Sequence, residues 1–437
     1  MIKRLLFILI ALPLLGRAQF NSVSPYSRFG LGDLVNPTFM QGFTMGHLSS
    51  GLRDPFNLNL NNPAASNALR MTTLEMSGKI GIINQTSSSL PTLQQTTASF
   101  NYFAMGIPVS DRYGISFGAL PFSAVGYRLS EYEEIDGIGG VTRQYQGNGG
   151  LNKLYLNQAL MFFDRLSIGA QVSYYFGSIE YLQDVRYRDA SFLSSRYDQN
   201  YLISDVNWSF GLQYIHPLSE KREITLGVAW ESQNDLAGKF SNTSFTYTAV
   251  GSRPFPRDTL QSDVQNEALR LPNQLSIGLT FGTKHPDLPG YAWMVGMEFR
   301  QADWSRFYET ANNPQTLQNS MRLGMGGEII PRYAIPSLYR SRSLFSNLKY
   351  RAGAYYYQSP VELRGQQINT TGMTFGIGLP LRVRGLAPGE ERNNTINIGF
   401  NYAIRGTRNE GLIREEISQI IFGVTLNDRW FIKYKYR

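Results

Sequence analysis

Apolar and polar residues alternate with a period of two along much of the chain. In 166–176, six apolar positions (Leu, Ile, Ala, Val, Tyr, Phe) alternate with Ser, Gly, Gln, Ser and Tyr. The same alternation recurs in 206–214, 224–230, 275–281, 293–300 and 396–402. Alternation over ranges this long indicates β-strands with one apolar and one wet face.

The pattern predicts a sheet of fourteen antiparallel strands. Long and short connections alternate almost throughout, as they do in outer-membrane barrels. An even strand count places both chain ends on the periplasmic side. The predicted strands are 72–83, 96–107, 112–130, 151–162, 165–177, 205–215, 222–232, 274–282, 291–300, 320–329, 347–357, 371–380, 393–403 and 416–426.

A soluble sandwich also alternates, so the orientation of the two faces needs separate evidence. The strand lengths suit a tilted membrane crossing. The wet face carries charged residues, among them Lys79, Glu298 and Arg351, as a watered lumen does. Aromatic residues collect near strand ends, where a membrane-interface girdle lies. We therefore expect an all-β transmembrane outer-membrane barrel.

Composition agrees with a barrel and excludes several other classes. The chain of 437 residues has 42 Gly, 26 Tyr, 26 Phe and only 17% charged residues. It has no Cys, which excludes disulfide scaffolds and thiolate metal sites. The net charge of +8 is spread without a basic run, so the sequence does not indicate a nucleic-acid partner.

The predicted organisation has four parts. Residues 1–18 form a cleaved signal peptide with a basic start, an apolar centre and a small-residue end. Residues 19–71 do not alternate but hold many hydrophobes, including Phe29, Phe43, Phe56 and Leu58. We expect this segment to be a hatch inside the lumen, because fourteen strands enclose more space than their side chains fill. Residues 72–426 form the barrel, and 427–437 a periplasmic tail.

The chain resembles the FadL/TodX family of hydrophobic-compound transporters. The resemblance rests on Phe29-Gly30, Met45-Gly46 and Asn62-Pro63-Ala64 in the leader, on 120–127 in the third strand, and on 147–151. It implies an N-terminal hatch whose Asn62, Pro63 and Ala64 act in gating near an inward kink of the third strand. It also implies lateral opening to lipid at that kink. Related barrels of this superfamily serve as accessory subunits of a protein secretion system.

Pro121 supports a kink independently of the resemblance. Proline donates no ladder hydrogen bond and is normally confined to bulges or edges. A bulge in a closed barrel would create a local edge at Pro121, Phe122 and Gly126 and a side exit for an apolar solute. Alternatively, Pro121 ends the membrane part of the strand and 122–130 project outside.

The alternation also predicts which aromatic and apolar groups reach the lumen. Our register places six candidates for ligand contact there: Phe103, Met105, Tyr155, Met161, Tyr355 and Tyr357. Packing against the hatch is the simpler role for these groups. The three histidines, His47, His216 and His285, stand at no mutual metal-ligand spacing, so we expect neither a metal nor another cofactor.

These features predict a non-enzymatic barrel in the cell outer membrane of a Gram-negative bacterium. The first hypothesis is passive uptake of hydrophobic small molecules, with lateral exit near the third strand; its partners are membrane lipid and a hydrophobic or detergent-like ligand. The alternative is a subunit of an outer-membrane protein secretion or assembly complex. A barrel lipase or protease is a weaker alternative, because the histidines scatter toward the periplasmic end, away from the long loops.

Overall fold

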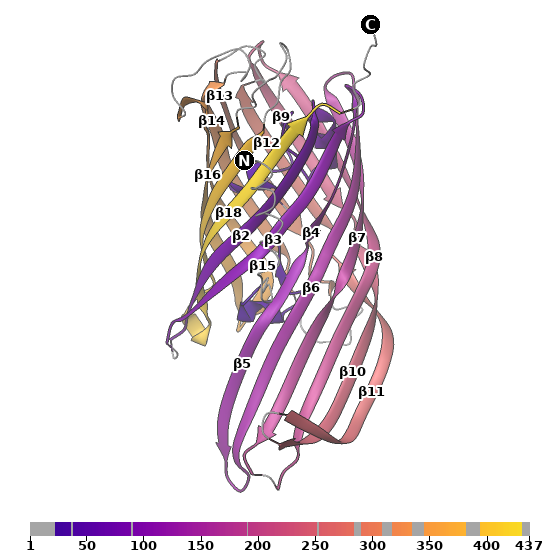
Figure 1. Cartoon of the computed structure of the whole chain (residues 1–437), viewed down its shortest axis with the longest axis vertical. Coiled ribbons are helices and arrows are strands. Elements are labelled where there is room, and N and C mark those ends of the chain that lie inside the picture. Colours follow the sequence, from indigo (N-terminus) through magenta and orange to yellow (C-terminus); the bar gives the residue numbers. More distant parts are fainter. Residues whose placement is uncertain are drawn as a thin grey trace, which may run out of the picture.

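A computed structural model describes residues 22–35, 38–88, 91–189, 191–250, 253–283, 290–307, 317–333, 345–381 and 394–430. Eighteen strands form one sheet, and fourteen of them close into a ring in which β18 pairs with β2 (Figure 1). The ring strands are β2 (Thr72–Thr86), β3 (Leu93–Pro108), β4 (Tyr113–Pro121), β6 (Gly139–Phe162), β7 (Leu166–Tyr187), β8 (Ser194–Pro217), β9 (Arg222–Glu231), β12 (Gln274–Thr283), β13 (Gly290–Ala302), β14 (Ser320–Tyr333), β15 (Lys349–Leu363), β16 (Gln366–Pro380), β17 (Thr395–Arg405) and β18 (Arg414–Asp428).

The predicted fold class is confirmed: the molecule is a closed fourteen-stranded antiparallel β-barrel of the outer-membrane type. Each of the fourteen predicted ranges coincides with one ring position. Outward side chains form an exposed apolar band, exemplified by Leu212, Leu279 and Phe400, whereas Gln213, Thr280 and Asn401 on the inner face are buried. Within the described residues, no helix is both long and apolar enough to cross a membrane.

The third strand is split in two, which resolves the two interpretations of Pro121. β4 ends at Pro121, and β5 (Ser123–Ile135) continues beyond Phe122 while still pairing with β6. Gly150 of β6 lies beside Ser123 at the break, and Gly177 of β7 pairs with the adjacent Leu151. Their φ values of 148° and 153° are a conformation that favours glycine. The strand is therefore broken at Pro121, and its outer part also projects.

The range 233–273, predicted as a long loop, is instead a β-hairpin. It consists of β10 (Asn234–Val250) and β11 (Arg253–Leu271), and β10 pairs with the outer half of β8. We call the sheet formed by β5, β10, β11 and the outer halves of β6, β7 and β8 the projecting sheet. It extends well beyond the rest of the barrel, at the end opposite the one where β18 finishes (Figure 1).

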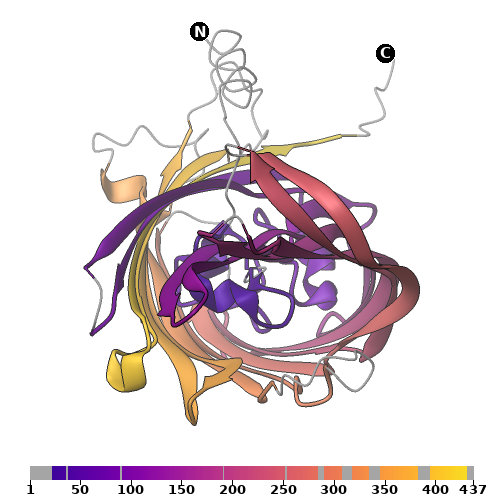
Figure 2. The same ribbon diagram turned by 90° about the horizontal axis from the view of Figure 1, so that it is seen from below.

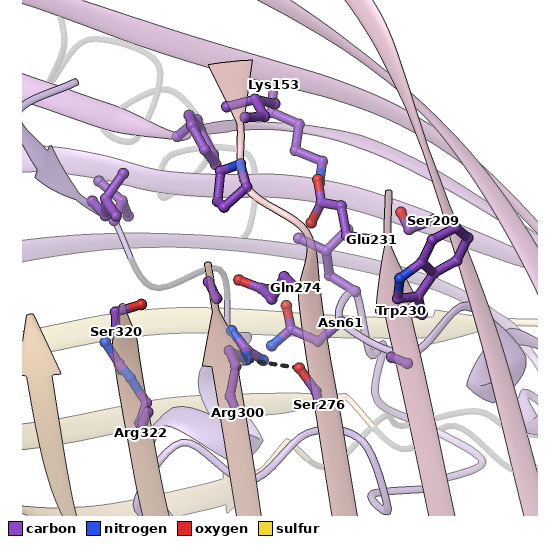
Figure 3. A pocket seen from close by; sticks show the side chains of 18 of the residues that line it. Asn61, Lys153, Ser209, Trp230, Glu231, Gln274, Ser276, Arg300, Ser320 and Arg322 are labelled. Carbon is purple, nitrogen blue, oxygen red and sulfur yellow. Dashed lines mark hydrogen bonds and ion pairs between the residues drawn. The ribbon is translucent and has the colours of Figure 1, made fainter. Parts of the chain in front are cut away.

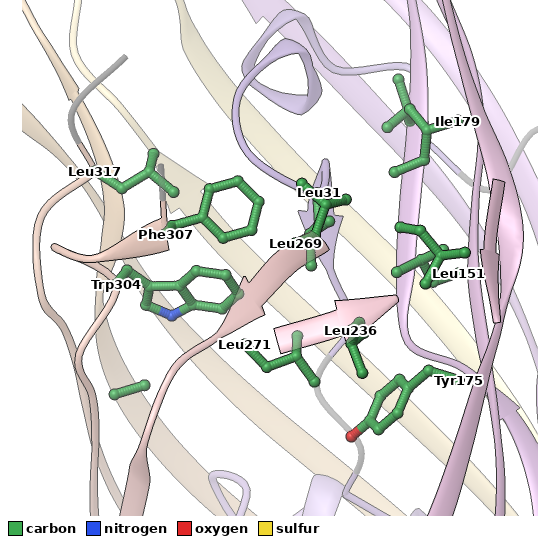
Figure 4. Packing of buried hydrophobic residues seen from close by; sticks show 13 residues of the cluster. Leu31, Leu151, Tyr175, Ile179, Leu236, Leu269, Leu271, Trp304, Phe307 and Leu317 are labelled. Carbon is green, nitrogen blue, oxygen red and sulfur yellow. The ribbon is translucent and has the colours of Figure 1, made fainter. Parts of the chain in front are cut away.

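A cluster of buried hydrophobic residues lies where the projecting sheet leaves the ring. Leu236, Leu269 and Leu271 of the hairpin pack with Trp304 and with Leu31 of the N-terminal segment (Figure 4). The base of the hairpin is therefore fixed to the inside of the barrel, although its tip extends away from it.

The predicted boundaries need one adjustment at the C-terminus. β18 continues to Asp428, so residues 427 and 428 belong to the barrel and not to a tail. Asn427 is buried, and its amide side chain accepts a 2.7 Å hydrogen bond from Thr73 Oγ1. The predicted signal peptide (1–18) and the residues of the tail beyond 430 lie outside the described residues.

Short elements make up the remaining regular structure. In the N-terminal segment these are η2 (Pro25–Arg28), β1 (Asp33–Leu34), α2 (Met40–Phe43) and η3 (Pro63–Ala68). Two more turns, η5 (Phe345–Asn347) and η6 (Asn409–Gly411), lie between ring strands.

Candidate functional site: the occupied lumen and the broken third strand

The N-terminal segment lies inside the ring (Figure 2). We call its described residues between 22 and 71 the hatch. Phe56 and Leu58 are buried as predicted, while Phe29 and Phe43 are half-buried against buried clusters. The hatch contains no long helix or strand, so its backbone groups depend largely on the barrel wall for partners.

Inward-facing glycines let the hatch backbone touch the wall directly. A Cβ on Gly227 would lie 1.7 Å from the Ser50 carbonyl oxygen, and one on Gly353 would lie 2.1 Å from the Gly46 nitrogen. A Cβ on Gly169 would likewise fall 2.3 Å from the Pro63 carbonyl carbon. The sequence carries a signal for these contacts, because the same glycines occupy the wet face of alternating strands.

A buried carboxylate fixes the middle of the hatch. Glu298 of β13 accepts hydrogen bonds from the backbone amides of Ser49 (3.2 Å) and Ser50 (2.8 Å) and from both serine hydroxyls (2.7 Å each). Arg300 donates to Ser49 Oγ at 3.1 Å and lies 3.9 Å from Glu298. The alternation predicted that Glu298 lies on the wet face, but it gave no sign of this role.

The Asn62-Pro63-Ala64 element packs against β6, β7 and β8. Asn62 caps η3, and its side chain donates to the Ser50 carbonyl at 2.8 Å and to the Leu212 carbonyl at 3.2 Å. Ser167 Oγ donates to the Ala64 carbonyl at 2.6 Å. η3 also contacts the first part of the third strand, β4, where Ser66 Oγ lies 2.9 Å from Ser116 Oγ.

At the break, the hatch takes the place of a neighbouring strand. β1 pairs with β5 through Asp33↔Ala124 and Leu34↔Ser123, and the Val35 amide donates to the Phe122 carbonyl at 2.9 Å. Arg405 of β17 holds this strand by donating to Asp33 at 2.8 Å. The Gly126 amide donates to Ser27 Oγ at 3.1 Å, so Gly126 binds the hatch as well.

The structure places four of the six predicted lumen candidates on the inner side. Tyr155 packs against the hatch, Tyr355 lies 4.6 Å from His47 between ring centroids, and Tyr357 lies 4.3 Å under the Arg322 guanidinium. Met161 is half-buried near the end of β6.

The prediction for Phe103 and Met105 was wrong: both side chains point outward. Phe103 is 37% exposed, whereas its neighbours Tyr102 and Ala104 are buried. Ser77 pairs with Tyr102 and Gly78 with Phe100, so Asn101 is an extra residue that forms a β-bulge in β3. Because one extra residue reverses the facing of everything that follows, the register deduced from 96–101 fails at Phe103.

Two of the cavities between the hatch and the wall lie beside the break in the third strand, and charged side chains line both. The one near Pro121 and Phe122 measures about 100 Å³ and includes Lys153, Glu231 and Arg300 (Figure 3). In it, Lys153 Nζ lies 3.5 Å from a Glu231 carboxylate oxygen. The other measures about 210 Å³ and includes Lys79, Arg322 and Arg405. Within the described part of the chain, no three His, Cys, Asp or Glu residues come together as metal ligands.

Comparison with known proteins gives a family and a fold. The family model BamG matches residues 1–437. No curated protein matches the sequence.

Several solved structures have a similar fold. They include the toluene transporter TbuX of Ralstonia pickettii (14% identity, TM-score 0.55, covering 90% of this chain and 98% of that one). The toluene transporter TodX of Pseudomonas putida is 14% identical with a TM-score of 0.53, and the match covers 91% of this chain and 100% of that one. A FadL homologue of Pseudomonas aeruginosa is 14% identical with a TM-score of 0.52, and the match covers 90% of this chain and 98% of that one. At this identity the similarity establishes the shared barrel fold alone.

Proposed function

The chain belongs to the BamG family, and we propose that it serves as a non-enzymatic barrel subunit of an outer-membrane protein secretion or assembly complex. The observation that carries the proposal is the projecting sheet. Its six strands extend far beyond the membrane-facing part of the barrel, and its hairpin is longer than β9 and β12, the two ring strands it connects. A structure of this kind suits contact with another protein more than it suits passage through the lumen.

The surface of the hairpin supports a protein partner. Leu260 and Val264 of β11 are 62% and 68% exposed, and Phe255 is also exposed. Large exposed apolar side chains that gather on one element are a feature of protein interaction sites. The hairpin is held firmly enough to present them, because Tyr247 donates a 2.7 Å hydrogen bond to the buried Asp184 of β7.

The occupied lumen supports the same proposal. Sites for small molecules are typically cavities of about 300–1,000 Å³. Here the cavities of about 100 and 210 Å³ contain several charged side chains. An apolar solute would have to displace a hatch whose backbone touches the wall at Gly227 and Gly353.

The broken third strand favours a second candidate, passive uptake of hydrophobic small molecules. The cavity of about 100 Å³ borders Leu120, Pro121 and Phe122, so a side exit would open beside it. In this candidate function Asn62, Pro63 and Ala64 would gate the path, and Tyr155, Met161, Tyr355 and Tyr357 would contact the solute. The transporters TbuX and TodX have the same fold, and their described substrate is toluene.

Native extraction of the chain from outer membranes tests the two functions together. We expect other outer-membrane proteins to co-purify in fixed ratio, and we expect this yield to fall when 234–271 is deleted. The deletion joins Gln233 to Pro272 and leaves β9 and β12 paired as a simple hairpin. A matched variant with Leu260→Ser and Val264→Ser keeps the hairpin but removes two exposed apolar side chains.

Uptake of toluene by whole cells is measured on the same strains and on Pro121→Val, which supplies an amide at the break. Loss of co-purified proteins from the deletion variant, with toluene uptake unchanged in every strain, supports a complex subunit. If no protein co-purifies in fixed ratio even with the wild type, and Pro121→Val loses toluene uptake, the proposal is overturned in favour of transport.

A further inference from the structure

One side of β3 has no ladder partner over its first ten residues. β3 pairs with β4 only from Phe103 to Pro108, whereas its pairing with β2 extends from Leu93 to Gly106. Beyond the break, β5 pairs with β6 on one side and with β1 on the other, and it does not pair with β3. Among the described residues, Leu93–Tyr102 thus forms a free sheet edge, and β3 and β5 diverge visibly (Figure 1).

Part of this edge lies at the level of the lipid-facing band. Phe100 points outward and is 47% exposed. Ala98 pairs with Ile80 and Thr96 pairs with Ile82, and both isoleucines are exposed on the outer face of β2. Lipid tails cannot hydrogen-bond to an open strand edge, so an edge at this depth is costly unless protein covers it.

The β3 edge lacks the features that normally prevent strand pairing. Proteins protect free edges with charged residues, proline or bulges. The strand Leu93–Pro108 contains no charged residue, and its only proline is the last residue. β11, a free edge of the projecting sheet, carries Pro254, Pro256, Arg257, Asp258, Asp263 and Glu267. The chain therefore protects β11 and leaves β3 open.

The opposite side of the same gap already accepts an added strand. β1 pairs with β5 at Ser123 and Ala124, although only over two residues. The cavity of about 210 Å³ borders both sides of the gap, with Thr97 and Asn101 from β3 and Ala124 from β5. A strand added to β3 would have room for small polar side chains on its inner face beside Thr97 and Asn101.

We propose that the free edge of β3 binds a transmembrane β-strand of another outer-membrane protein. The strand that fits is uncharged where it pairs, with apolar side chains next to Phe100 on the lipid side and polar ones next to Asn101 on the inner side. Backbone hydrogen bonds provide the affinity, as in other cases of β-strand addition. This inference rests on the proposed function and deepens it by naming the docking surface and the partner's chemistry.

Photocrosslinking from the edge tests the proposal in intact cells. A benzoylphenylalanine replaces Phe100, and the matched control replaces Phe400, which also points outward but lies on β17, paired on both sides. We expect Phe100 to give an adduct at least tenfold above that of Phe400. Mass spectrometry should map the adduct to an alternating strand of a different outer-membrane protein.

Paired proline variants test whether backbone pairing is responsible. Consecutive amides of a strand point to opposite edges. One of the two variants Thr97→Pro and Ala98→Pro therefore removes an amide that faces β2, and the other removes an amide that faces the gap. The variant with the intact β2 ladder should still give a heat-resistant barrel, and its adduct at position 100 should be lost.

Three outcomes would overturn the inference: adducts with lipid alone, adducts with a second copy of this chain, or an adduct that persists in both proline variants. If fixed-ratio partners still co-purify in these cases, the proposed function stands and only the docking surface is wrong. Absence of co-purifying partners from the wild type would reject the proposed function itself. The photocrosslink requires no substitution in the backbone, so it decides the question even where both proline variants fail to fold.

Discussion

The hatch and the β10–β11 hairpin are both additions to the fourteen-stranded ring, but they are attached in opposite ways. The hatch is irregular and binds the wall through buried carboxylates, capped turns and direct backbone contact at glycines. The hairpin is regular and binds through a ladder with β8 and through side chains outside the membrane. The comparison indicates that the hatch maintains the closed lumen, whereas the hairpin can change without opening the barrel.

Glu298→Ala should produce the largest effect, because it removes the acceptor of four hatch hydrogen bonds and the partner of Arg300. Breaking a buried ion pair by removing one member costs about 3–5 kcal/mol. We expect a barrel that still inserts but conducts ions in planar bilayers and loses its heat resistance at a lower temperature.

Glu180→Ala is the matched control for Glu298→Ala, because Glu180 is exposed on the projecting sheet. This control should conduct no more than the wild type. Equal conductance of the two variants would show that the position of the hatch does not depend on Glu298. The hatch and the hairpin would then not differ in the way proposed above.

Gly227→Ala should have an intermediate effect through shape alone. Its Cβ would lie 1.7 Å from the Ser50 carbonyl oxygen, so the hatch must move away from β9. Overpacking of this kind costs about 1–3 kcal/mol. Gly78→Ala is the control, since its Cβ would have its nearest neighbour at 3.6 Å. The heat-resistance midpoint of folded barrels in detergent should fall for the first variant and stay unchanged for the second.

The same contrast explains what the sequence could predict. Strands such as 275–281 alternate strictly because one face meets lipid and the other meets the lumen. β10 and β11 leave the lipid, so beyond their buried base they need no continuous apolar face and the alternation disappears. The prediction of a 41-residue loop between 232 and 274 was therefore wrong. The bulge at Asn101 was hidden for a related reason. Aromatic residues occupy both faces there, with Phe100, Tyr102 and Phe103 in close succession.

The site was less predictable than the ring. A glycine on the wet face of a strand can accommodate a hatch or simply thin the wall. Only the folded contacts distinguish Gly227, which meets Ser50 of the hatch, from Gly81, which meets Gln419 and Thr97 of the neighbouring strands. Glu298 was assigned to the lumen correctly, but its partners Ser49 and Ser50 are more than 200 residues away in a segment without a periodic pattern. Pairing between the hatch and the wall is therefore a tertiary property that no local pattern encodes.

Tyr247→Phe should have the smallest effect and should be confined to the hairpin. The phenol donates to Asp184, which keeps Arg186 at 2.7 Å, so the loss is that of one hydrogen bond, about 0.5–1.5 kcal/mol. We expect faster protease cleavage within β10 and β11 on intact cells, with conductance and heat resistance unchanged. Tyr132→Phe, at an exposed tyrosine of β5, should leave cleavage as it is in the wild type.

The pH dependence of cleavage sharpens this last test. Burial raises the pKa of Tyr247, and its hydrogen bond to the Asp184 carboxylate raises the pKa further. A raised pKa in the folded state means that the protonated phenol stabilises the hairpin at every pH below the ordinary tyrosine pKa of about 10, and that this contribution disappears as the pH rises through the raised value. The rates of protease cleavage of the wild type and of Tyr247→Phe should therefore differ at neutral pH and become equal as the pH rises beyond about 10. A difference that instead disappeared below neutral pH would assign the attachment of the hairpin to its carboxylates and not to Tyr247.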